Sequence, residues 1–218
     1  MKNLILASNS PRRKELLSLF GWPFTIVPAD IAEDRLFDEK PKDYVRRLAT
    51  EKAVMVAKVH HGLVIGADTI VVDVKELMGK PVDQNDARRM LRQLRSRTHH
   101  VYTGIALLDS EPGKVYCDVC CTDVPMRAYS DAEIESYIKT GDPMDKAGAY
   151  AIQHDDFHPV EDLQGCFASV MGLPLCHLAV GLSKFGMDIP AELPDRCQAL
   201  LNYACPIQER IMGLVERD

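Results

Sequence analysis

A short apolar strand runs into a serine-rich turn at Leu4-Ile5-Leu6-Ala7-Ser8-Asn9-Ser10-Pro11-Arg12-Arg13. Ser10 is a good N-cap and Pro11 suits a first helical position, so the pattern predicts a helix over residues 12–20 that Gly21 closes. The free N–H groups of such a turn carry partial positive charge, and arginine side chains match phosphate oxygens. On these residues alone, an ordinary capped helix is favoured over an anion-binding site.

Strand-like and helix-like segments alternate after this opening. Apolar runs that predict strands cover residues 3–7, 24–27, 63–74, 99–108, 114–126 and 149–152. Helical spacing covers residues 43–60, the stretch that Asp83 caps, and residues 131–140, which Ser130 and Glu133 open as a capping box and Gly141 ends. The runs at 101–108 and 115–124 predict a hairpin. We therefore expect an α/β protein with a mixed, twisted sheet flanked by helices.

Length and charge narrow the possible partners. A chain of 218 residues is expected to form one domain with two lobes. Its net charge of −6 means that any basic region is a local pocket, so no nucleic-acid partner is expected. No run approaches the ~20 apolar residues of a membrane span, and residues 4–7 are too short for a signal peptide.

The seven cysteines are odd in number and unevenly spaced, which argues against a disulfide framework and favours a reducing, cytoplasmic location. The cluster Cys117-x-x-Cys120-Cys121 lies in an alternating run, where cysteines behave as small strand residues, and no second pair completes a zinc site. His99 and His100 are adjacent and are expected on opposite faces of a strand.

An acidic residue interrupts the apolar run Gly66-Ala67-Asp68-Thr69-Ile70-Val71-Val72. A carboxylate is costly to bury in such a strand unless it is paired, binds a metal or faces a cleft. We therefore favour a functional Asp68 over an acid that merely caps a nearby turn.

Three lysines are further candidates. Lys52 lies in a helical segment, Lys80 stands between Gly79 and Pro81, and Lys146 follows a turn rich in glycine and aspartate. Taken singly, each is expected to be a solvated surface ammonium. The usual nucleotide-binding glycine motifs are absent from the chain.

Taken together, these stretches resemble the Maf family of nucleoside triphosphate pyrophosphatases. The resemblance covers residues 3 to about 182 and rests on seven ordered pieces: Ala7-Ser8-Asn9-Ser10-Pro11-Arg12-Arg13 with Glu15-Leu16-Leu17; Glu51-Lys52-Ala53; Gly66-Ala67-Asp68-Thr69-Ile70-Val71; Gly79-Lys80-Pro81 with Asp86-Ala87 and Met90-Leu91; Thr98-His99 with Thr103-Gly104; Asp145-Lys146-Ala147-Gly148-Ala149-Tyr150 with Ile152-Gln153; and Val170-Met171-Gly172-Leu173-Pro174-Leu175.

The resemblance implies a two-lobed fold similar to the inosine triphosphatases, with a cleft between the lobes. It also implies hydrolysis of a nucleoside triphosphate to the monophosphate and pyrophosphate, a house-cleaning role in nucleotide metabolism, a divalent cation (Mg²⁺ or Mn²⁺) and a homodimer. Residues 1–188 would form the pyrophosphatase domain and residues 189–218 a C-terminal helical appendage.

The resemblance further assigns roles to residues. Asp68 would be the proton acceptor, and Glu33 with Asp68 would hold the metal. The substrate would be bound by Ser8, Arg12, Arg13, Glu33, Lys52, Thr69, Lys80 and Gln153. Arg12, Thr69 and Gln153 mark the branch that prefers dTTP and UTP.

Two departures from the family pattern leave alternatives open. The loop at residues 154–159 replaces the glycines that many relatives have after Gln153, and the tail after Ile189 has no counterpart in the family motifs. The same chemistry on methylated or deaminated purine nucleotides therefore remains an alternative, as does a nucleotide-binding regulator of cell division and septation.

Overall fold

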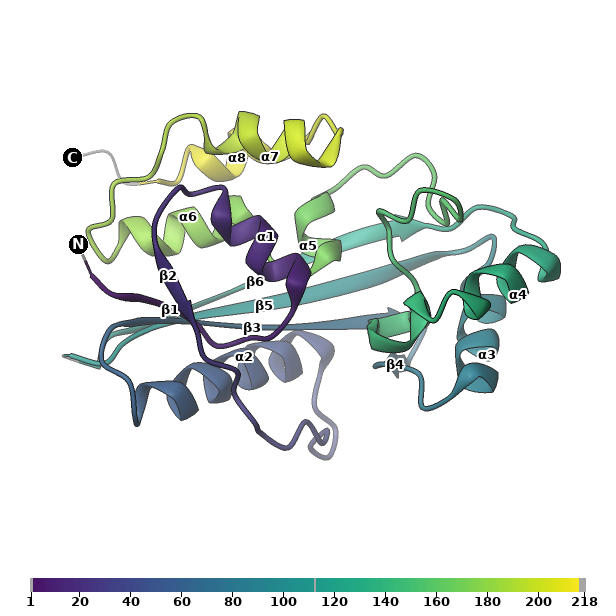
Figure 1. Cartoon of the computed structure of the whole chain (residues 1–218), viewed down its shortest axis with the longest axis horizontal. Helices are drawn as coiled ribbons and strands as arrows, with labels where there is room; N and C mark the ends of the chain where they lie inside the picture. The colour runs from purple at the N-terminus through teal and green to yellow at the C-terminus, as the bar shows by residue number, and fades with distance from the viewer. Residues whose placement is uncertain (1, 112, 216–218) are drawn as a thin grey trace.

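A six-stranded mixed sheet forms the centre of the computed structural model, which describes residues 2–111 and 113–215 (Figure 1). The strands are β1 (Leu4–Leu6), β2 (Phe24–Ile26), β3 (Leu63–Asp73), β4 (Glu76–Met78), β5 (Thr98–Asp109) and β6 (Val115–Pro125). Their order is β2-β1-β3-β5-β6, and β4 pairs with β3. β1 is parallel to β2 and β3, whereas β3, β5 and β6 are antiparallel neighbours. The predicted mixed α/β class and the β5–β6 hairpin are confirmed.

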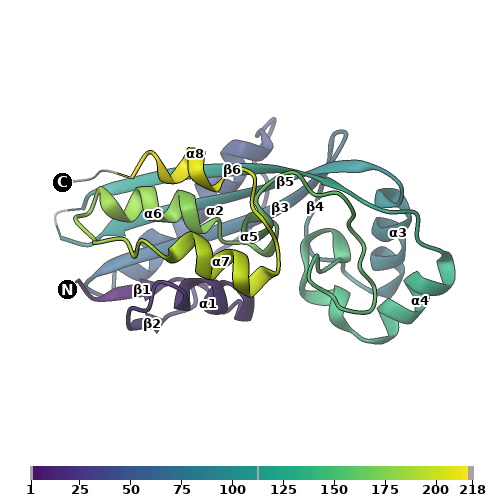
Figure 2. The same cartoon turned by 90° about the horizontal axis from the view of Figure 1, so that it is seen from above.

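Helices cover both faces of the sheet. They are α1 (Pro11–Ser18), α2 (Pro41–Ala57), α3 (Gln84–Leu94), α4 (Asp131–Lys139), α5 (Phe167–Met171), α6 (Leu175–Ser183), α7 (Leu193–Leu201) and α8 (Gln208–Met212), with 3₁₀ turns η1 (Asp142–Asp145) and η2 (Ala147–Ala149). α2 packs on one face, while α1, α5 and α6 lie on the other, with α7 and α8 outside them (Figures 1 and 2). α3 and α4 form a second group at the far end of the long strands (Figure 2).

The predicted caps are confirmed. The Ser10 side chain accepts a hydrogen bond from the Arg13 backbone N–H, and Asp83 accepts one from Asp86. Ser130 and Glu133 form a reciprocal capping box at the start of α4. Helix α1 ends at Ser18, two residues earlier than predicted, because the following turns close with shorter i→i−3 hydrogen bonds.

Two glycines let α2 approach the sheet closely. A Cβ at Gly66 of β3 would lie 2.0 Å from the Ala49 backbone oxygen, and one at Gly104 of β5 would lie 2.4 Å from the Val45 oxygen. Only a residue without a side chain fits at either position. The close approach brings one face of α2 directly over the middle of β3.

Two local predictions are wrong. Residues 149–152 were expected as a strand but form the end of η2 and a loop, because Gly148 and Ala149 both have left-handed backbone conformations (φ 69° and 60°). β4 was not predicted, since it has only three residues and follows a turn in which Val74 has a φ of 55°.

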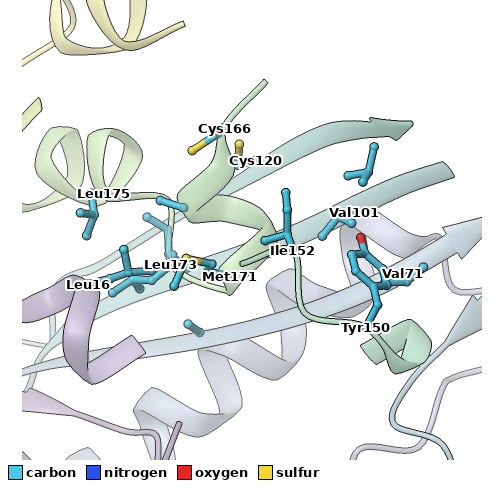
Figure 3. Close-up of a cluster of buried hydrophobic side chains, with 14 of the residues drawn as sticks. Leu16, Val71, Val101, Cys120, Tyr150, Ile152, Cys166, Met171, Leu173 and Leu175 are labelled. Carbon is cyan, nitrogen blue, oxygen red and sulfur yellow. The ribbon is translucent and has the colours of Figure 1, made fainter. Parts of the chain in front are cut away.

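The main core lies on the α1, α5 and α6 side of the sheet (Figure 3). Figure 3 shows Leu16 of α1 beside Leu173, and the side chains of Cys120 and Cys166 near the start of α5. Residues 186–215, which we call the C-terminal segment, add the fully buried Leu193 to this core. Within residues 2–111 and 113–215, no helix is long and apolar enough to cross a membrane.

Candidate active site

A cleft with a volume of about 410 Å³ opens where β1 leads into α1, beside the middle of β3. One wall comes from the turn before α1 and the loop before α2, and the other from Gly79, Lys80 and residues 145–153. All nine residues that the sequence singled out line this cleft: Ser8, Arg12, Arg13, Glu33, Lys52, Asp68, Thr69, Lys80 and Gln153. The fold thus gathers segments that are far apart in the sequence around one space.

A lysine joins two carboxylates on one side of the cleft. Lys52 Nζ lies 2.7 Å from Asp68 Oδ1 and 2.7 Å from Glu33 Oε1. Asp68 points toward α2 from β3, and the close packing of α2 at Gly66 brings Lys52 to it. Lys52 and Asp68 are both buried. The expectation that Lys52 is a solvated surface ammonium is therefore wrong.

The two acids respond differently to this environment. Burial raises the pKa of Asp68, and the charges of Lys52 and Arg13 only partly offset that effect. Burial also acts to raise the pKa of Glu33, but the hydrogen bond from Lys52 and the charges of Lys52, Lys80 and Arg13 outweigh it and lower that pKa. Neighbouring carboxyls whose pKa values are driven apart are typical of a site in which one acid takes up a proton.

The Arg13 guanidinium is held by three acceptors on the opposite side of β3. Its Nε donates to the Gly172 oxygen (2.8 Å), Nη1 to Ser8 Oγ (3.2 Å) and Nη2 to Thr69 Oγ1 (3.2 Å). Burial lowers the pKa of Arg13, and the charge of Asp68 opposes that shift. An arginine remains protonated at neutral pH even so. Arg13 is therefore a fixed positive charge with a set orientation.

Lys80, Arg12 and Gln153 are less constrained. Lys80 and Gln153 are exposed at the rim, as expected for Lys80. Arg12 Nη1 lies 3.3 Å from Asp145 Oδ2, so it bridges from α1 to the turn η1 on the other wall. These three side chains can reach a bound molecule without disturbing the buried group around Asp68.

Lys146 is buried, so the expectation of a surface ammonium is wrong here too. Its Nζ donates to Asp142 O (2.6 Å), Asp142 Oδ1 (2.7 Å) and Asp145 Oδ1 (2.7 Å). These three bonds use all three ammonium protons, so Lys146 stabilises the turn that leads to Gln153.

Sequence reasoning missed two tyrosines that line the cleft. The Tyr44 hydroxyl donates to the Glu33 backbone oxygen (2.8 Å), which holds the loop before α2, and burial raises the Tyr44 pKa to about 12. The Tyr150 hydroxyl lies 2.8 Å from His99 Nε2, and burial lowers the pKa of that imidazole to about 4. His99 and Tyr150 both belong to pieces of the family resemblance, although 51 residues separate them in the sequence.

The strand cysteines behave as the alternation predicted. Cys120 is buried and Cys121 is exposed, on opposite faces of β6, and His99 and His100 also alternate. Among the described residues, His100, Cys121 and Asp123 bring candidate ligand atoms within 4.8 Å of one another. All three are exposed and lie outside the cleft lining.

Comparison with known proteins gives a family match over residues 3–185, to the family described as "Maf-like protein". A "dTTP/UTP pyrophosphatase" of Geobacter sulfurreducens is 46% identical over 184 residues, which cover 84% of this chain and 96% of that protein. Proteins with the same name are 48% identical in Geotalea uraniireducens (84% of this chain, 95% of that protein) and 43% identical in Dictyoglomus turgidum (86% and 98%).

A solved structure, titled nucleoside-triphosphatase or dITP/XTP pyrophosphatase, from Mycobacterium abscessus also aligns with the chain. The TM-score is 0.37 and the identity 14%, over 57% of this chain and 74% of that one. The C-terminal segment lies beyond the family match.

Proposed function

The chain belongs to the family of Maf-like proteins, and on that basis we propose that it is a nucleoside triphosphate pyrophosphatase acting on dTTP and UTP. Three relatives at 43–48% identity bear the name dTTP/UTP pyrophosphatase, and each is covered over nearly its whole length. The products would be the nucleoside monophosphate and pyrophosphate, so the enzyme would be a hydrolase of an acid anhydride.

The observation that carries the proposal is the group of Asp68, Lys52 and Glu33 facing Arg13 in one cleft, in which Asp68 and Lys52 are buried. Cleavage beside the α-phosphorus needs an in-line water, a base to accept its proton and positive charge on the departing pyrophosphate. Asp68 supplies a base whose raised pKa makes it a stronger proton acceptor than an ordinary aspartate. Arg13 supplies a charge that needs no reorientation.

The proposed reaction is the attack of a water molecule on the α-phosphorus. The oxygen of a water molecule bonds to the α-phosphorus while the bond between that phosphorus and the bridging oxygen breaks. The water proton passes to an Asp68 carboxylate oxygen, and the electron pair of the broken bond leaves on the pyrophosphate. Arg13 and Lys80 stabilise the charge that grows there, while Lys52 favours the ionised form of Asp68 that accepts the proton as the water attacks.

The donor set also fits a divalent cation, which we propose as Mg²⁺ or Mn²⁺. Carboxylate oxygens of Glu33 and Asp68 already converge on a single positive charge, the ammonium of Lys52. Hard oxygen ligands of this kind, together with phosphate oxygens, suit Mg²⁺. When bound there, the cation would neutralise charge on the phosphate oxygens.

Base preference is proposed to depend on Arg12, Thr69 and Gln153. The amide of Gln153 is exposed at the cleft rim and offers both a donor and an acceptor to a pyrimidine edge. The loop that follows Gln153, residues 154–159, is held in place by hydrogen bonds, because Arg127 donates to the backbone oxygens of Phe157 and His158.

The first test measures pyrophosphate release from dTTP, UTP, dATP, GTP and 7-methyl-GTP with Mg²⁺ or Mn²⁺. We expect the highest kcat/KM for dTTP and UTP. The variant Asp68→Asn should lose about 10²- to 10⁴-fold in kcat, the usual contribution of a general base.

Asp73→Asn is the matched control, because Asp73 is also a buried aspartate of β3 but lies outside the cleft lining. It should keep the wild-type kcat. A modified purine nucleotide at the top of the ranking would reject the pyrimidine preference. Binding of nucleotides without any pyrophosphate release would instead favour a regulator of cell division.

Three broader properties remain proposals. The family resemblance supports a homodimer, which the mass of the protein in solution would test. The unevenly spaced cysteines support a reducing, cytoplasmic location. We propose that the chain divides into a pyrophosphatase domain, residues 1–188, and a C-terminal appendage, residues 189–218.

A further inference from the structure

The C-terminal segment contacts both of the elements that hold Arg13. It lies outside the family match, and its helices α7 and α8 form the outermost layer above α5 and α6 (Figures 1 and 2). Leu193 anchors it in the main core with no exposed surface. Two side chains, Tyr203 and Arg196, then reach inward to backbone groups.

Tyr203 fastens the chain that leads into α5. Its hydroxyl lies 2.9 Å from the Leu163 oxygen and 2.9 Å from the Gly165 oxygen, and it accepts a 3.3 Å hydrogen bond from the Gly165 N–H. Its ring lies 5.5 Å from that of Phe167, the first residue of α5. One tyrosine therefore fixes the position at which α5 begins.

The end of α5 in turn supplies one of the three acceptors that orient Arg13. The Gly172 oxygen, directly after α5, accepts from Arg13 Nε at 2.8 Å. Gly172 has a φ of 107°, and a Cβ there would lie 3.2 Å from both Arg13 Nε and Thr69 Oγ1, so glycine is needed for this approach.

A chain of hydroxyl groups makes the second link from α5. The Thr103 hydroxyl donates to the Ser169 oxygen of α5 (2.8 Å), which is an acceptor only. Because the Thr103 proton is used there, the Thr69 hydroxyl must donate to Thr103 (3.0 Å) and accept from Arg13 Nη2 (3.2 Å). The direction of every bond from α5 to the guanidinium is thus determined.

Arg196 fastens the helix on which Arg13 stands. Its Nη1 donates to the Leu19 oxygen at 3.0 Å, directly after the last residue of α1. That carbonyl is one of those that a helix terminus leaves without an intrahelical partner. The C-terminal segment therefore holds α1 through Arg196 and α5 through Tyr203.

We propose that the C-terminal segment is a brace for the active site, in which Tyr203 and Arg196 are positioning residues that keep the Arg13 guanidinium aligned with the leaving pyrophosphate. This proposal rests on the proposed function for the role of Arg13. A displacement of about 1 Å in a catalytic group can lower the rate by about 10²-fold, so small shifts of α5 or α1 would be measurable.

The test compares Tyr203→Phe, which keeps the ring but removes the hydroxyl, with Tyr116→Phe as the control. Tyr116 is also half-buried, and its hydroxyl makes a single long contact of 3.5 Å with Asp118, outside the cleft. Affinity for inorganic pyrophosphate, measured by calorimetry, is the primary readout, and kcat/KM for dTTP is the second. We expect Tyr203→Phe to weaken both by about tenfold and Tyr116→Phe to leave both unchanged.

A double-mutant cycle separates positioning from general destabilisation. If Tyr203 acts through Arg13, the loss on Tyr203→Phe should vanish in the Arg13→Ala background. The proposal would be overturned if Tyr203→Phe weakened pyrophosphate affinity equally in the wild-type and Arg13→Ala backgrounds. It would also be overturned if Tyr203→Phe bound pyrophosphate as tightly as the wild type. If Tyr203→Phe does not fold, the same measurements are made on Arg196→Met. Its control is Arg210→Met, at an exposed arginine.

The two proposals fail in different ways. A wild-type protein that releases no pyrophosphate from dTTP or UTP contradicts the proposed function, while the affinity for pyrophosphate still decides whether the brace exists. An active enzyme in which Arg13→Ala matters and Tyr203→Phe does not contradicts the brace alone.

Discussion

Asp68 and Glu33 share one counterion, the ammonium of Lys52, yet their pKa values move in opposite directions. Asp68 is almost wholly buried, so the loss of hydration dominates and raises its pKa. The Glu33 side chain is 54% exposed, and the surrounding cations lower its pKa. At the scale of single residues, the depth of burial therefore distinguishes a carboxylate that takes up a proton more readily from one that stays ionised to lower pH.

The pH dependence of catalysis should follow from this pair. A base works only when it is deprotonated, so kcat/KM is expected to fall as the pH drops through the Asp68 pKa. Lys52 lowers that pKa, and the variant Lys52→Met should therefore move the acid limb of the kcat/KM profile to higher pH, besides reducing activity. Lys58→Met, an exposed lysine directly after the same helix, is the control and should leave the limb in place. An unmoved limb in Lys52→Met would argue that Asp68 is not the titrating base.

Base preference should depend on Gln153. Replacing Gln153 by alanine removes one donor and one acceptor, and it is expected to reduce the ratio of kcat/KM for dTTP over dATP. A site built to use a hydrogen bond can discriminate by up to ~10⁴-fold, so the effect should be easy to measure. Gln84→Ala, at the exposed start of α3, is the matched control. An unchanged ratio in Gln153→Ala would move base recognition to other residues.

The sequence predicted the charged residues of the site better than their partners. Asp68 could be found because a carboxylate is unusual in a β-branched run, whereas Arg13 was assigned to the site only through the family resemblance. Two of the three partners of Arg13, Ser8 and Thr69, were among the predicted site residues, but the Gly172 oxygen could not be predicted, since it is a backbone atom 159 residues away. Surface position was wrongly expected for Lys52 and Lys146 because burial depends on the pairing of elements, which a single residue does not reveal.

At the scale of elements, the position of α2 depends on two glycines in adjacent strands. Gly66 and Gly104 are the places where backbone oxygens of α2 come closest to the sheet. This close contact between α2 and the sheet determines the distance between Lys52 of α2 and Asp68 of β3. The packing of a whole helix thereby controls one 2.7 Å contact in the cleft.

Gly66→Ala should therefore lower the stability of the protein. The added Cβ would lie 2.0 Å from the Ala49 oxygen, so α2 must move away from β3. Overpacking of this kind costs about 1–3 kcal/mol, which thermal or denaturant unfolding would detect. Gly79→Ala is the control, because nothing lies within 4 Å of its added Cβ, and its midpoint should match that of the wild type.

Helix starts that depend on residues close together in the sequence could be predicted. Segments whose conformation depends on left-handed backbone angles could not. The caps at Ser10, Asp83 and Ser130 lie within three residues of their partners, which explains their success. The wrong strand at residues 149–152 has apolar side chains because it packs on the core, while the left-handed conformations of Gly148 and Ala149 interrupt any extended pairing.

At the scale of the whole molecule, the C-terminal segment is part of the main core. Leu193 is fully buried, and Cys197, Leu201 and Tyr203 pack against the same cluster. The family match ends at residue 185, so residues beyond it form part of the core. We therefore expect the C-terminal segment to contribute to the free energy of unfolding.

Leu193→Ala should test that view. Truncation of a fully buried leucine costs about 2–5 kcal/mol, so the denaturant midpoint is expected to fall markedly. Leu200→Ala lies in the same helix but at a side chain that is 41% exposed, and a much smaller change is expected. Equal midpoints for the two variants would indicate that the segment is only loosely attached.

The long strands also determine how the cleft can change its width. β3, β5 and β6 run without interruption from the layer of α2 and α6 to the group of α3 and α4 (Figure 2), and the β3–β5 ladder is continuous from Leu63↔Asp109 to Val72↔His100. A joint of two flexible linkers would allow one wall to swing freely, but an unbroken hydrogen-bonded ladder resists such rotation. The two walls therefore cannot rotate independently, and any change in the width of the cleft requires twisting or bending of these three strands.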